Sequence, residues 1–252
     1  MLQKFLTPRW IAGHLLVLIV VGVFIRLGIW QLDRLSERRA LNDSVSARLA
    51  LPTTDLRDLL DVASPDEWEH RAAIATGTFD VTEEILIRSR TSNGEAGFHV
   101  VTPLVIGDDV AVLVNRGWVP LEYDDPPVSP ALPVARLTEV TGTVRVSQSA
   151  PILGPRDPSD GILERMYWID IPRIQQQSSY ALLPVSLQLQ AQVPGQIGSL
   201  PVPVPPSDLT EGSHLAYSVQ WFAFALIGMG GYVALLRRSG KGGGVGESDG
   251  VG

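Results

Sequence analysis

Two long apolar runs, one near each end of the chain, constrain its fold more than any other feature. The first covers residues 11–29 and the second covers residues 215–236. As helices, both are about long enough to cross the ~30 Å hydrocarbon core of a bilayer. They also explain why a chain of 252 residues combines a mean hydropathy of +0.15 with only 19% charged residues. The pattern predicts a membrane protein and argues against a plain soluble enzyme.

The alternative for the first run is a cleaved signal peptide. The apolar core of a signal peptide covers only about 7–15 residues and precedes a small-x-small cleavage site. The run seen here is longer, and it continues through Trp30 and Gln31 without such a site. We therefore expect an uncleaved anchor, with one transmembrane helix over residues 11–32 and a second over residues 214–236.

Basic residues beside the two runs predict the topology. Lys4 and Arg9 precede the first run, while Arg237 and Arg238 follow the second. By the positive-inside rule, both termini lie in the cytoplasm, and the protein is a two-span protein of the plasma membrane. Three arginines after the first run give the opposite signal, namely Arg34, Arg38 and Arg39. The expected layout is a cytoplasmic N-terminus (1–10), an extracytoplasmic domain (33–213) and a disordered glycine-rich cytoplasmic tail (237–252).

The middle of the chain reads as an acidic, β-rich domain. Residues 33–214 hold 25 acidic and 14 basic residues, so a nucleic-acid partner is not expected. Short β-branched or alternating runs predict strands, and turn residues separate them. The expected strands are 72–79, 85–90, 98–106, 110–119, 137–146, 167–171 and 184–192, and the expected helices are 34–51, 55–60 and 172–180. The predicted fold class is α+β, with two transmembrane helices flanking a mostly antiparallel, barrel-like or sandwich domain that carries a few short helices.

The residues that bind metals and perform redox chemistry are scarce. The chain has no cysteine, which excludes disulfides, thiolate metal sites and covalent c-type haem attachment. Its four histidines are scattered, without the spacing of a multi-histidine metal site. No motif of a nucleophilic hydrolase or a phosphate-binding loop is present, so we do not expect an enzyme.

Polar and aromatic residues gather where the two predicted spans leave the membrane on the outer side. Trp30 and Gln31 end the first span, and His214, Tyr217 and Trp221 share one face at the start of the second. An aromatic belt at the membrane surface accounts for the tryptophans and the tyrosine. It accounts less well for the histidine and for two glutamines, Gln31 and Gln220, which makes this cluster a candidate binding site.

A second motif lies inside the middle domain, where a hydrophobic strand ends in Asn115-Arg116-Gly117-Trp118. Asn and Gly suit a turn or a bulge, and Arg116 could pair with an acid of its own domain. Alternatively, Arg116 could present its charge to a ligand carboxylate. Both interpretations of Arg116 stay open at this point.

Four segments together resemble the surfeit locus 1 family of cytochrome c oxidase assembly factors. They are Gly28-Ile-Trp-Gln-Leu-Asp-Arg34, Gly97-Phe-His-Val-Val-Thr-Pro-Leu104, Val114-Asn-Arg-Gly-Trp-Val-Pro120 and His214-Leu-Ala-Tyr-Ser-Val-Gln-Trp-Phe222. Their order and the span–domain–span layout cover nearly the whole chain. His14 and Arg38-Arg39 resemble the actinobacterial branch of the family. The chain departs from the family pattern at Gly212-Ser213, where the family usually has an asparagine before the histidine.

The resemblance implies an assembly factor that helps to place haem a in subunit I of a haem-copper oxidase. It implies that His214 is a ligand of the haem iron, with Trp30, Gln31, Tyr217, Trp221 and Arg116 as further cofactor-binding residues. The expected partners are subunit I, other oxidase or supercomplex subunits and the lipid bilayer. The alternative function is a scaffold that docks on the oxidase and never touches haem.

Overall fold

The computed structural model describes residues 6–241, which form two compact units. One unit comprises the described parts of Met1–Ser44 and Asp208–Gly252, and the other comprises Val45–Ser207. The expected cytoplasmic segments at both ends fall partly outside the described residues, since Lys4 and residues 242–252 are not among them.

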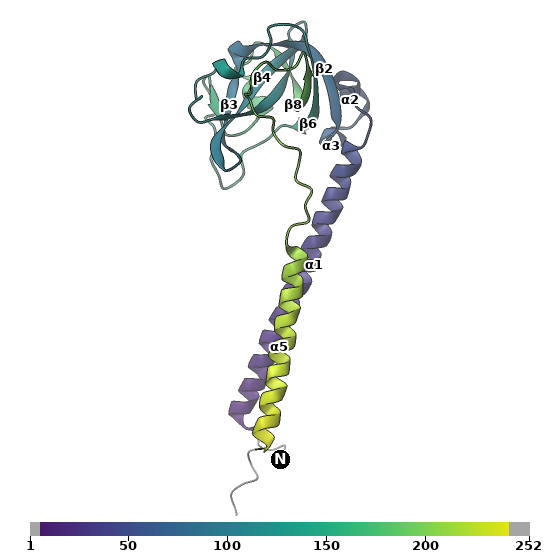
Figure 1. Ribbon diagram of the computed structural model, residues 1–252, viewed down its shortest axis with the longest axis vertical. Helices are drawn as coiled ribbons and strands as arrows, with labels where there is room; N and C mark the ends of the chain where they lie inside the picture. The colour runs from purple at the N-terminus through teal and green to yellow at the C-terminus, as the bar shows by residue number, and fades with distance from the viewer. Residues whose placement is uncertain (1–5, 242–252) are drawn as a thin grey trace, which may run out of the picture. The chain divides into compact units, whose positions relative to one another are not determined.

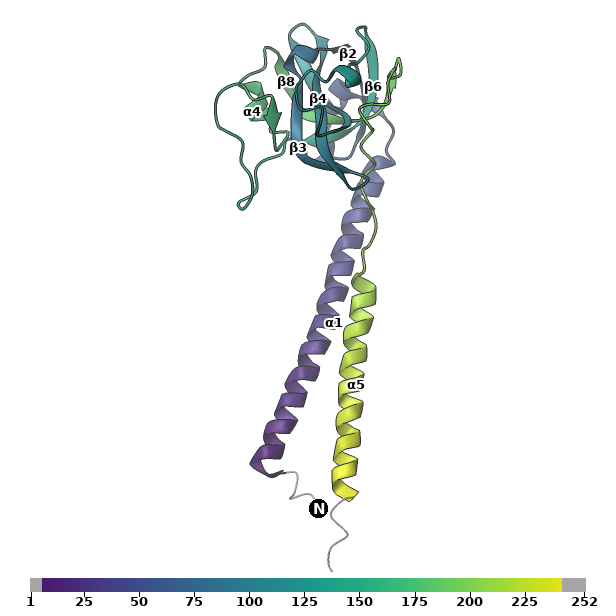
Figure 2. The ribbon, with the colours of Figure 1, turned by 60° about the vertical axis from the view of Figure 1, so that its left-hand side comes forward.

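The first unit holds two long helices, namely α5 (His214–Lys241) and α1 (Pro8–Leu49) up to Ser44. Both are long and apolar enough to cross a membrane, and only 11% and 6% of their most apolar windows are buried. This low burial distinguishes them from the core helices of a soluble domain. The first apolar run and the helix expected over residues 34–51 are one continuous helix, and α5 runs past the expected end at residue 236. Both ribbon views show α5 alongside α1 (Figures 1 and 2).

The second unit is built on a mixed sheet of eight strands in the order β1-β2-β6-β8-β5-β4-β3-β7. An additional antiparallel pairing joins β2 to β4, so that β2, β6, β8, β5 and β4 form a closed ring. The pairs β1–β2, β3–β7 and β5–β8 are parallel and the others are antiparallel. The strands are β1 (Thr54–Asp55), β2 (Ala72–Phe79), β3 (Ile85–Ser92), β4 (Glu95–Gly107), β5 (Val110–Pro120), β6 (Thr138–Val146), β7 (Arg165–Met166) and β8 (Ala181–Val193).

Short helices connect strands of this unit along the chain (Figure 1). They are α2 (Leu56–Val62), α3 (Pro65–Trp68) and α4 (Ile171–Gln175), with 3-10 turns η2 (Val81–Glu83) and η3 (Ser129–Ala131). Leu56 and Leu59 of α2 pack into the main core, which consists of inward-facing residues of the closed ring such as Val112, Val114 and Leu187. Ile171 and Ile174 of α4 cover a second core against β3, β4 and β5. Both faces of β5 are therefore buried.

The expected strand over residues 167–171 is absent, and the expected helix over residues 172–180 is wrong in extent. The strand β7 covers only Arg165–Met166, and helix α4 begins at Ile171. The Asp170 side chain accepts a hydrogen bond from the Arg173 amide at 3.1 Å and caps this helix, and Pro172 suits its first turn. The helix ends at Gln175, and beyond it Ser178 and Ser179 donate hydrogen bonds to the Glu83 carboxylate.

Candidate functional site

His214 is the first residue of α5, and its ring contacts α1. The Nδ1 atom of His214 lies 2.9 Å from the Oε1 atom of Gln31. Both residues belong to the helix pair, so this contact lies within one unit of the structure. The structure thus joins two of the residues that the sequence placed in a common cluster.

A close contact between the helices lies one turn deeper. The hydroxyl of Ser218 donates a hydrogen bond of 3.0 Å to the backbone carbonyl of Gly28, and Ser218 is buried. A Cβ atom on residue 28 would lie 2.7 Å from the ring of Phe222, so glycine is needed for this approach. Along α1, the buried positions Val21, Gly28 and Leu35 recur every seventh residue, as on the packed face of a coiled coil.

The aromatic residues of the predicted cluster have different surroundings. Trp221 packs on Phe24 with 5.6 Å between the ring centroids, which places it in the interface between the helices. Trp30 is 42% exposed and Tyr217 is 49% exposed, and the guanidinium of Arg34 lies 5.8 Å from the Trp30 ring. Trp221 therefore packs between the helices, while Trp30 and Tyr217 remain partly exposed.

The backbone of Gly212 lies beside the edge of the His214 ring that carries Nε2. Gly212 adopts φ +69°, and a Cβ atom there would lie 3.8 Å from Nε2 and 3.7 Å from Cδ2. Among residues 6–241, Nε2 has no hydrogen-bond partner. The same part of the chain contains no group of three or more His, Cys, Asp or Glu residues placed to hold a metal ion. The donor set is thus one imidazole, which could supply a single ligand to a haem iron.

Charged and polar side chains of α1 hold the segment that leads into α5. Arg38 donates to the backbone carbonyls of Asp208 and Thr210 at 3.0 and 3.2 Å. Arg39 forms a bidentate ion pair with Glu211, with both distances 2.8 Å. In the sequence, these arginines appeared as a conflicting topology signal and as a resemblance to one branch of a family, without any structural partner. Their partners are about 170 positions away along the chain, and no local pattern indicates such a contact.

Arg116 lies in the other unit, where it is 1% exposed. It sits at a bulge between β4 and β5, and its guanidinium stacks 5.2 Å from the Phe79 ring and contacts Glu84 at 3.5 Å. Burial raises the pKa of Glu84 and lowers the pKa of Arg116 to about 10, which leaves the guanidinium charged at neutral pH. Glu84 is thus the acidic partner of Arg116 within the same domain, which was one of the two interpretations left open by the sequence.

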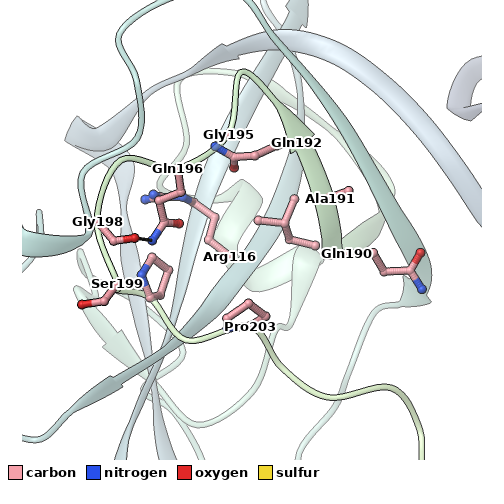
Figure 3. A pocket seen from close by; sticks show the side chains of 11 residues that line it. Arg116, Gln190, Ala191, Gln192, Gly195, Gln196, Gly198, Ser199 and Pro203 are labelled. Atoms are coloured by element: carbon pink, nitrogen blue, oxygen red, sulfur yellow. Dashed lines mark hydrogen bonds between the residues drawn. The ribbon is translucent and has the colours of Figure 1, made fainter.

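A cavity of about 320 Å³ lies next to Arg116. Figure 3 shows the Arg116 side chain reaching toward Gln196, with Gln190 and Gln192 also at the cavity wall. Within the described part of the chain, the buried atoms Nε of Arg116 and Oε1 of Gln192 have no hydrogen-bond partner. One donor and one acceptor fit ordered water or a neutral polar group, because Glu84 already balances the charge of Arg116.

Comparisons with known proteins place the sequence in a family. Residues 18–226 match the model of the SURF1 family. An uncharacterized SURF1-like protein of Mycobacterium tuberculosis is 33% identical over 230 residues, which cover 88% of this chain and 81% of that protein. A SURF1-like protein of Monosiga brevicollis is 28% identical over 231 residues (85% and 84%). Surfeit locus protein 1 of Xenopus tropicalis is 28% identical over 229 residues (82% and 70%).

Proposed function

Because this chain belongs to the SURF1 family, a family of assembly factors and not a known enzyme family, we propose that it assists the assembly of a haem-copper cytochrome c oxidase. In this role it binds haem a transiently and delivers it to subunit I. The contact between His214 and Gln31 is the observation that carries the proposal, since it orients one imidazole whose Nε2 atom has no hydrogen-bond partner among the described residues.

The helix pair offers a site that suits an amphiphilic macrocycle. Haem a has an apolar ring and tail with two propionates, and when bound it supplies an iron that takes an axial imidazole. The exposed faces of Trp30 and Tyr217 can flank the ring. Arg34 is exposed and paired with Glu37 at 2.8 Å, so it can turn to a propionate at low cost. A single histidine ligand also allows the release that delivery requires.

The same helices anchor the protein in the plasma membrane in this proposal. Large apolar side chains cover their exposed surfaces, among them Leu18 at 67% and Leu226 at 71%. Such a surface is stable in lipid and not in water. With both termini in the cytoplasm, His214 lies at the outer edge of the bilayer, and the β-rich unit lies outside the cytoplasm.

The test is oxidase assembly in cells that produce the full chain at equal levels. Cells with His214→Ala should yield oxidase with a markedly lower haem a content in subunit I than cells with the unchanged chain. His14→Ala is the matched control, because His14 also lies on the helix pair, where it contacts Tyr232, and it should preserve oxidase yield. Equal haem a content with and without His214 would refute the proposal.

A docking scaffold is the second candidate, and an exposed loop of the β-rich unit favours it. Ile152 and Leu153 are each 91% exposed between Pro151 and Pro155. Two adjacent exposed apolar side chains offer apolar surface that a protein partner could cover. If His214→Ala leaves assembly unchanged while Ile152→Ser with Leu153→Ser abolishes it, the scaffold function is supported instead.

A further inference from the structure

We propose that Gln31 is a positioning residue that holds the His214 ring in the tautomer able to bind iron. The inference rests on the proposed function, in which His214 is the axial ligand. It goes further because it assigns a role to a second side chain and a proton to a particular nitrogen. The contact that carries it is the 2.9 Å approach of the Gln31 Oε1 atom to the His214 Nδ1 atom.

The chemistry of the two groups determines where the proton lies. An amide oxygen only accepts hydrogen bonds, so at this distance the Nδ1 atom of His214 must donate. A neutral imidazole carries one N–H, and a proton on Nδ1 therefore leaves a lone pair on Nε2. A metal-binding histidine commonly donates its other ring N–H to a fixed acceptor, which sets the ring orientation and raises the basicity of the ligand.

The backbone around the pair fixes this geometry. The Ser218–Gly28 hydrogen bond and the contact of Gly28 with Phe222 lie one turn away from His214 and Gln31. Gly28 and Gln31 are three residues apart, and His214 and Ser218 are four apart, so each pair lies on one helix face. The register of the two helices therefore places the Gln31 amide opposite the ring.

The glycine beside the other edge of the ring is consistent with the same assignment. Nε2 faces the position where a side chain of residue 212 would lie, and that residue is glycine. If the Gln31 amide were turned by 180°, its N–H would donate to Nδ1 and the ring proton would move to Nε2. A ring in that state cannot bind iron through Nε2. The two orientations thus predict opposite tautomers, and an experiment can distinguish them.

The test uses the full chain without haem, labelled with nitrogen-15 in histidine and reconstituted in lipid nanodiscs. Nitrogen-15 chemical shifts distinguish the two tautomers, and His214→Ala identifies the signals of this ring among four histidines. We expect the Nδ1–H tautomer in the unchanged chain and in Gln31→Glu, and a shift toward Nε2–H in Gln31→Leu. Gln220→Leu is the matched control, because Gln220 is an exposed glutamine of α5, and it should leave the tautomer unchanged.

An Nε2–H ring in the unchanged chain, or an Nδ1–H ring that persists in Gln31→Leu, would overturn the inference. The Gln31→Glu variant is the control for misfolding. An Nδ1–H ring in this variant shows that a substitution at position 31 does not by itself change the tautomer. Haem binding gives an independent readout: a carboxylate at position 31 should lower the midpoint potential of bound haem, because it makes the ligand more basic. If the tautomers behave as expected but the protein binds no haem, the proposed function fails and the assignment of the proton stands.

Discussion

Ser218 of α5 donates a hydrogen bond of 3.0 Å to the backbone carbonyl of Gly28 of α1, and this contact sets the register of the helix pair. It is buried, and it lies one turn below the contact between His214 and Gln31. Close approach through a small residue and a serine hydroxyl is a common way to join helices in lipid. The position of the candidate site therefore depends on packing between the helices as well as on its own residues.

Replacing Gly28 with alanine should separate the helices. The new Cβ atom would lie 2.7 Å from Phe222, and such overpacking costs about 1–3 kcal/mol. Gly22→Ala is the matched control, because it gains the same helix propensity and meets nothing within 4 Å. Unfolding of the full chain in mixed micelles with a denaturing detergent measures the difference. Equal stability of the two variants would show that the helices do not pack at Gly28.

Removing the charge of Arg116 should destabilise the β-rich unit strongly. Arg116→Met leaves Glu84 buried and without its ion partner, and breaking such a buried pair costs about 3–5 kcal/mol. Arg165→Met breaks the exposed pair with Asp124, which is worth about 1 kcal/mol or less. Denaturant unfolding of the full chain, followed by tryptophan fluorescence, compares the two variants. Comparable losses from both would contradict the internal role of Arg116.

The β-rich unit should lose stability as the pH falls from about 6.5 to about 4. Burial, and then the charge of Arg90, lower the pKa of His99 to about 4, so the unfolded chain takes up the proton first. Stability is full above the unfolded pKa and falls by up to about 3 kcal/mol across this window. His99→Gln should flatten the pH dependence of the unfolding free energy. The raised pKa of Glu84 makes a contribution of opposite sign to this pH dependence, and the substitution leaves that contribution unchanged. A slope identical to that of the unchanged chain would refute this role.

Local patterns predicted most of the elements. The strand β2 has the expected bounds, because the alternation of residues 72–79 matches one buried face. The errors lie where short-range capping overrides the pattern, as at Asp170 and Pro172, which start a helix within an apolar run. Parallel pairing of β5 with β8 was also not predicted, since strand order depends on contacts between distant segments.

The candidate site was predicted only in part, for a related reason. Spacing along each helix placed His214 and Gln31 at similar depths, but their hydrogen bond depends on the register between two helices. The Arg39–Glu211 pair and the Arg116–Glu84 pair likewise join residues far apart in the chain. Residue types indicated which side chains needed partners, whereas the choice of partner required the folded structure.

The central claim is that His214 is the haem ligand of this protein, and an optical spectrum tests it most directly. The full chain, purified in detergent from cells that make haem a, should show a Soret band, and His14→Ala should retain it. We predict that His214→Ala, purified in the same way and equally folded by circular dichroism, loses this band. An undiminished Soret band in His214→Ala, or none in the unchanged chain, would contradict the claim.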